Sequence, residues 1–233
     1  MAFPTTRWSL LAQATIHGDA AQTEALAEFY RRYREPVVSF IRQQGTAGAQ
    51  AEDLAQEFFL HLIQSSTLQR VDPLRGRFRS FLLGTLTRFL ARTRVRNEAA
   101  KRGSGAIPLS LDDPASGTDE PAVPADVARA FDREWARELL IRVRHDLEAD
   151  WKGEAAALAM LLRFLPGAVD TPAYEAAAAG LGWPLARLKT DVFRLRSQFR
   201  ERVRAEIALT VDAPHEIEAE MAHLHLVLSD PSA

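Results

Sequence analysis

Three arginines recur at every fourth position in a helix predicted for the first half of the chain. Arg88, Arg92 and Arg96 therefore share one face of that helix. Like charges at this spacing repel each other by about 0.2–0.5 kcal/mol per pair. An anionic partner such as DNA phosphate would offset this repulsion, so the row predicts an anion-binding surface.

A second basic helix is predicted from Pro184 to about Ala205, after a short helix and a turn at Gly182. Two helices joined by a tight glycine-containing turn are typical of a helix-turn-helix, whose second helix enters the major groove. Four polar side chains near its start are placed to reach base edges: Arg187, Lys189, Thr190 and Arg194. A further row suits phosphates: Arg196, Arg200 and Arg204. The alternative is an ordinary amphipathic helix with a solvated basic face.

An acidic face is predicted on a third helix, at about residues 51–64, which precedes both basic helices in the chain. Asp53, Gln56, Glu57 and Leu60 are spaced i, i+3, i+4 and i+7, which places them together. Such a face can dock another protein, but spacing alone favours a solvated surface.

The formal net charge of −2 hides a block pattern. Residues 68–105 hold ten bases and two acids (+8), and residues 185–205 hold seven bases and two acids (+5). Residues 106–128 hold five acids without a base (−5), and residues 206–233 hold six (−6). Two basic blocks separated by an acidic one indicate two anion-binding surfaces, although solvated helix faces would give the same counts.

The sequence shows none of the residue patterns that would indicate an enzyme or a metal site. It has no cysteine, which excludes disulfides and thiolate metal sites and favours a reducing, cytoplasmic setting. We find no phosphate-binding loop and no carboxylate cluster, so we expect no catalytic residues, metal or cofactor. No signal peptide or membrane-spanning segment is expected either.

The fold class expected is all-α, with two small helical domains. The apolar period predicts helices over about 21–44, 51–64, from 77 onward, 131–147, 154–165, 172–180, 184–205 and 206–228. Pro36 should kink or split the first helix, and Thr171-Pro172 should cap the sixth. The expected domains are 1–103, an acidic linker at 104–126, 127–210, and an acidic extension at 211–233.

These residues resemble a known family when they are taken in order. Glu52 to Phe59 looks like region 2.2 of sigma factors, Phe78 to Leu83 like the start of region 2.3, and Tyr174 to Arg204 like region 4. The order of these blocks and the acidic linker resemble the extracytoplasmic-function group of the sigma-70 family. The resemblance covers about residues 5–228.

The resemblance implies a two-domain promoter-recognition subunit of RNA polymerase. The residues that would dock on the clamp of the largest polymerase subunit are Asp53, Gln56 and Glu57. Those that would bind the −10 element are Arg77, Arg79, Arg88, Arg92, Arg96 and Lys101. Those that would read the −35 element are Arg187, Lys189, Thr190, Arg194 and Arg196. The implied partners are core polymerase and promoter DNA, with an anti-sigma protein as a further candidate and no membrane.

Two questions stay open at this level. A helix-turn-helix regulator that acts without polymerase is the alternative function, although it leaves the Asp53–Glu57 face unexplained. The acidic extension is expected to pack on the second domain or to regulate it, and its charge of −6 against +5 suggests that it screens the basic helix at 185–205.

Overall fold

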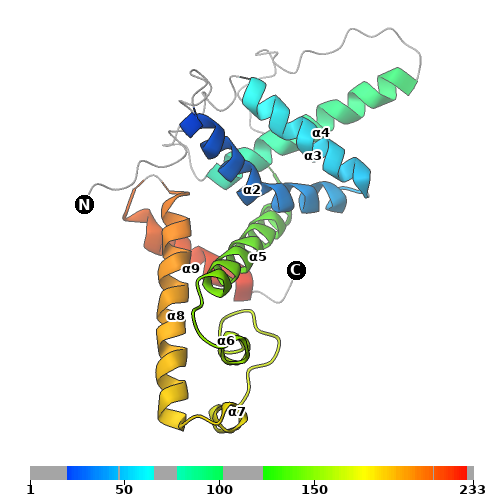
Figure 1. Cartoon of the computed structure of the whole chain (residues 1–233). Helices are drawn as coiled ribbons and strands as arrows, with labels where there is room; N and C mark the ends of the chain where they lie inside the picture. The colour runs from blue at the N-terminus through cyan, green and yellow to red at the C-terminus, as the bar shows by residue number, and fades with distance from the viewer. Residues whose placement is uncertain (1–19, 47, 66–77, 102–122, 212, 230–233) are drawn as a thin grey trace. The chain divides into compact units, whose positions relative to one another are not determined.

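The computed structural model describes residues 20–46, 48–65, 78–101, 123–211 and 213–229. Throughout these ranges the regular structure is helical and no strand occurs, which confirms the expected all-α class (Figure 1). The chain divides into two compact units, Met1–Ala136 with Leu209–Ala233, and Arg137–Ala208. This division differs from the expected boundaries, because the beginning of the 125–149 helix and the C-terminal extension fall with the first helices.

The first unit contains α2 (Ala20–Gln43), α3 (Ala49–Gln64), α4 (Phe78–Lys101), the start of α5 (Ala125–Ala149) and α9 (Glu216–Ser229). Aromatic side chains hold the first three helices together. Phe29 of α2 lies edge-on to Phe59 of α3 and to Phe78 of α4, with ring centroids 5.5 and 5.7 Å apart. Phe58 packs on Phe89 at 5.5 Å. With these aromatic faces turned inward, the polar faces of α3 and α4 point outward.

Pro36 does not end α2, contrary to one of the two outcomes expected for it. The helix continues from Ala20 to Gln43, with Pro36 buried inside it. Its flanking apolar residues, Val37, Val38 and Ile41, are fully buried, and their packing offsets the hydrogen bond that proline cannot donate.

The second unit contains the rest of α5, α6 (Ala155–Leu162), α7 (Tyr174–Leu181) and α8 (Leu185–Ala208). Six residues of α8 form its buried stripe: Leu188, Val192, Leu195, Phe199, Val203 and Ile207. Gly182 ends α7 in the left-handed conformation (φ +65°), where a side chain would be strained. The Trp183 amide donates to the Ala178 carbonyl at 2.9 Å and closes this tight turn into α8.

Two predicted helix boundaries were wrong. Thr171 does not cap α7, because the first helical hydrogen bond runs from the Ala177 amide to the Ala173 carbonyl, 3.0 Å away. The C-terminal segment is not one helix from 206, because α8 ends at Ala208 and α9 begins at Glu216. Pro214 lies between them, and proline disfavours helical backbone in the residue before it.

Candidate nucleic-acid interface

The arginine row of α4 runs along the side of the helix that borders α3, where Arg96 meets Glu57. Arg96 is exposed, whereas Arg88 and Arg92 are partly covered, and Arg88 donates to the Thr85 hydroxyl at 3.2 Å. Arg94, which the sequence reasoning left out, donates to the Gln44 carbonyl at 3.1 Å and joins α4 to the end of α2. Lys101 is the last residue of α4, and Arg77 lies outside the described residues. Thus three of the six predicted cations, Arg88, Arg92 and Arg96, line one face.

The acidic face of α3 adjoins this row. Asp53 and Gln56 are exposed, and Leu60 keeps 55% of its surface accessible. Glu57 accepts from Arg96 across 2.7 Å, and both side chains remain nearly half exposed. Exposed ion pairs of this kind stabilise a fold by about 0–1 kcal/mol. Glu57 and Arg96 can therefore each leave the pair to bind another partner. The structure therefore brings the predicted acidic and basic residues side by side on the first unit.

Arg79 differs from the other predicted cations. Only 3% of its surface is accessible, so it cannot contact DNA in this arrangement. Its guanidinium lies 3.9 Å above the Trp135 ring, donates to Asp132 at 3.0 Å, and donates to Glu220. Desolvation lowers the pKa of Arg79, but the carboxylates of Asp132 and Glu220 outweigh it and hold that pKa above its usual value.

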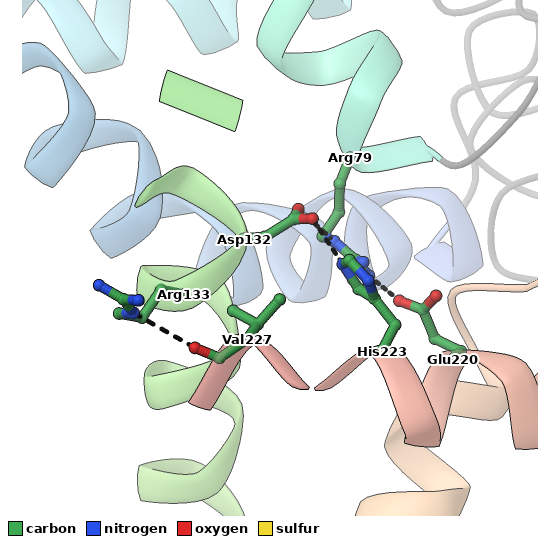
Figure 2. Close-up of polar contacts among 6 residues, drawn as sticks. All are labelled: Arg79, Asp132, Arg133, Glu220, His223 and Val227. Carbon is green, nitrogen blue, oxygen red and sulfur yellow. Dashed lines mark hydrogen bonds and ion pairs between the residues drawn. The ribbon is translucent and has the colours of Figure 1, made fainter. Parts of the chain in front are cut away.

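The partners of Arg79 gave no signal in the sequence. Asp132 and Glu220 lie 53 and 141 positions further along the chain. Figure 2 shows these side chains converging with His223, whose Nε2 lies 2.7 Å from an Asp132 oxygen. Only the amphipathic spacing of α9 hinted that it has a buried face.

On α8 the predicted polar residues are all exposed, but they divide between two sides. Arg187 stacks on Trp183 at 3.9 Å and reaches Asp191 at 3.7 Å, and Arg194 reaches the same carboxylate at 3.8 Å. This side borders a hollow of about 480 Å³ whose walls include Trp151 and Trp183.

Lys189 and Thr190 begin the other exposed side of α8. It also carries Phe193, which is 73% exposed and which the sequence reasoning had not singled out. Thr190 donates to the Ala186 carbonyl within the helix at 2.9 Å. Arg196 is exposed, yet its Nε donates to the Phe164 carbonyl at 2.9 Å. Arg196 therefore also joins α8 to the end of the α6 region.

Comparison with known proteins identifies the first unit. Residues 29–100 match the family model for sigma-70 region 2, a stretch that includes the α3 acidic face and the arginine row of α4. No curated protein and no solved structure matches the chain. Among the described residues, no helix has the length and apolar character needed to cross a membrane. The chain therefore contains a sigma-70 region 2, which supports a place in the sigma-70 family of non-enzymatic transcription initiation factors.

Proposed function

We propose that this protein is a sigma factor of the extracytoplasmic-function type, which binds RNA polymerase core and directs it to promoters. The observation that carries the proposal is the region 2 match over residues 29–100. Region 2 of sigma factors binds core polymerase and promoter DNA, and the matched stretch holds one surface suited to each partner.

The polymerase-docking surface consists of Asp53, Gln56, Glu57 and Leu60 on α3. Its acidic groups are accessible and its leucine is 55% exposed, a combination suited to a partner that offers cations around an apolar centre. The clamp of the largest polymerase subunit is the proposed partner.

The −10 surface consists of Arg88, Arg92 and Arg96 on α4. Arginines spaced one helical turn apart can follow a phosphate backbone, and their mutual repulsion falls when phosphates intervene. The Glu57–Arg96 pair joins this surface to the docking surface, so binding of core would free Arg96 for DNA.

The −35 surface is proposed on α8 of the second unit. The α7–α8 pair has the short connection of a helix-turn-helix, and the exposed start of α8 carries Arg187, Lys189, Thr190 and Arg194. This support is independent of the family match, which ends at residue 100. The expected linker at 104–126 lies mostly outside the described residues.

Run-off transcription tests the proposal directly. Purified protein is mixed with core polymerase and a promoter library, and specific transcripts are expected only when both proteins are present. Tight, sequence-specific binding to DNA without core, and no transcripts with it, would support a polymerase-independent regulator instead.

The docking surface is tested by Asp53→Ala with Glu57→Ala. Core affinity should fall by about tenfold or more, because two charge pairs at an interface are lost. Glu24→Ala with Glu218→Ala is the matched control, since it removes the same charge from exposed sites of the first unit outside α3. Equal core affinity for both double variants in a titration would remove the docking assignment.

A further inference from the structure

The hollow beside the start of α8 has the size and the lining of a small-molecule site. Its volume is about 480 Å³, and its lining comes from residues 151–198, so it lies within the second unit. Two of its lining residues, Ala157 of α6 and Leu195 of α8, are apolar and keep only 3% of their surface accessible. Small-molecule sites are typically hollows of about 300–1,000 Å³ with a largely apolar lining. This hollow is therefore suited to an organic ligand.

The indole ring of Trp151 forms one wall of the hollow and is held in place. Its Nε1 donates to the Glu154 carbonyl at 3.1 Å. Gly153 lies against the ring, because a Cβ at this position would come within 2.9 Å of the indole Nε1, Cε2 and Cζ2 atoms. A flat ring that is already ordered loses little conformational entropy when another ring stacks on it. Trp151 is therefore preorganised to bind a planar ligand.

A second planar surface comes from Trp183 and Arg187. The Arg187 guanidinium carbon lies 3.9 Å from the centre of the Trp183 ring, and both residues line the hollow. Aromatic rings stack on guanidinium planes as well as on aromatic side chains. Together with Trp151, this stacked pair favours an aromatic ligand.

The charges around the hollow are balanced. Arg187 and Arg194 lie 3.7 and 3.8 Å from the Asp191 carboxylate, which is too long for hydrogen bonds. The guanidinium N–H groups and the carboxylate oxygens can therefore still bind a ligand. With the carboxylate of Glu154, the lining carries two positive and two negative charges. Such a lining favours a ligand that offers both an anion and hydrogen-bond donors over a simple anion or cation.

The acidic C-terminal extension was expected to screen this basic helix. The structure instead shows α9 packed within the first unit, where Glu220 pairs with Arg79 of α4. Within the described residues, Arg187 and Arg194 have their ion-pair partner, Asp191, in the second unit itself.

We propose that this hollow binds a free nucleotide whose base carries an amino group. The base stacks against Trp151 and the Arg187–Trp183 pair, its amino group donates to Asp191, and its phosphate accepts from Arg194. A base within duplex DNA cannot enter in this way, because its neighbours cover both of its faces. The ligand is therefore a mononucleotide rather than the DNA proposed to bind α8.

The nucleotide site goes beyond the proposed function and does not rest on it. The hollow lies outside residues 29–100, the stretch that carries the family match. Arg187 and Arg194 also belong to the proposed −35 surface, so a bound nucleotide and promoter DNA would compete for α8.

A ligand series tests the chemistry of the site. The full-length protein is titrated with AMP by calorimetry, and indole fluorescence is followed in parallel. AMP should bind and change the fluorescence, whereas adenosine and inorganic phosphate should each bind at least about tenfold more weakly, because each lacks one half of the contacts. UMP, whose base has no amino group, should also bind about tenfold more weakly than AMP. Equal affinity for AMP and phosphate, or for AMP and UMP, would overturn the proposal.

Arg194→Gln tests the phosphate contact. AMP affinity should fall by about tenfold, because one charge-assisted hydrogen bond is lost. Arg200→Gln is the matched control, since it removes the same charge from an exposed position of α8 that does not line the hollow, and AMP affinity should stay within twofold of the parent. Equal losses in the two variants would indicate a general attraction to the basic helix and would overturn the site.

Gly153→Ala tests the positioning of Trp151. The added Cβ displaces the indole ring, so AMP affinity should fall by about tenfold while the weak affinity for inorganic phosphate stays unchanged. Gly180→Ala is the control in the same unit, because its Cβ would meet its nearest neighbour, Met160, at an ordinary 3.9 Å. Unchanged AMP affinity in Gly153→Ala would remove Trp151 from the site and overturn the proposal.

A single-stranded adenine oligonucleotide distinguishes a free nucleotide from a nucleotide in a strand. Binding of the oligonucleotide without binding of AMP would overturn the proposal and assign the hollow to an unpaired strand. Absence of binding by both would overturn it as well. Run-off transcription with core reports separately on the proposed function, because neither result depends on the other.

Discussion

The two basic helices, α4 and α8, look alike in sequence but differ in how far the fold buries their arginines. In α4 one arginine, Arg79, is withdrawn into the interior, where two carboxylates and an indole ring surround it. In α8 the cations at the start of the helix remain exposed, and their carboxylate partner Asp191 is on the same surface. The comparison shows that a count of positive charges overstates the number of cations that α4 exposes.

The difference in burial is tested most directly by removing one arginine from each helix. Arg79→Ala should lower the free energy of unfolding of the first unit by about 3–5 kcal/mol, because the buried carboxylates around it lose the counter-charge that Arg79 supplies. Arg194→Ala, at a side chain that is 72% exposed, should stay within about 0.5 kcal/mol of the parent. Denaturant unfolding measures the first effect through the fluorescence of Trp135, in variants whose other three tryptophans are replaced by phenylalanine. Circular dichroism measures the second. Similar stability of the two variants would mean that Arg79 is not buried in solution.

The salt dependence of promoter binding tests the two helices at cations that the fold does not bury. Arg92→Gln in α4 and Lys189→Gln in α8 should each flatten the dependence of log affinity on log salt by about 0.7–0.9, the value for one phosphate contact. The measurement uses holoenzyme and promoter DNA, so that both helices are engaged. Because the two residues belong to separate units, the double variant should show the sum. An unchanged slope for Arg92→Gln would exclude the row on α4 from the DNA contact.

The smallest effect is expected from the carboxylate on the exposed face of α8. Asp191→Asn should tighten promoter binding by no more than about fivefold, because surface pairs such as those with Arg187 and Arg194 contribute about 0–1 kcal/mol. The effect should shrink as salt screens the surface. Weaker binding by the variant would show that Asp191 positions the two arginines rather than competing for them.

Much of the fold was predictable because it depends on neighbours within a turn or two. The 3.6-residue spacing of apolar side chains located α3 within two residues and identified the buried stripe of α8. The predicted helix boundaries were wrong near two prolines, at Thr171-Pro172 and at Pro214. A proline can stand in the first turn of a helix or in the segment before it, and the sequence alone does not distinguish these two positions.

The candidate surfaces were predictable to a different degree. The acidic face of α3 and the row on α4 depend on helical spacing alone, and the structure brings them together through Glu57 and Arg96. The destination of the acidic extension was not predictable from charge, because its −6 is complementary to both basic blocks, +8 and +5. α9 packs in the first unit through its buried apolar stripe and the single carboxylate within that stripe.

The sequence by itself therefore determined that the chain is helical, where its cations gather, and which family its first helices resemble. These properties follow from residue type and short-range spacing. Only the tertiary structure decided which cations are available to a partner. The burial of Arg79 depends on Asp132 and Glu220, 53 and 141 positions away, and the free energy of a charge is set by the solvent and counter-charges that folding places around it.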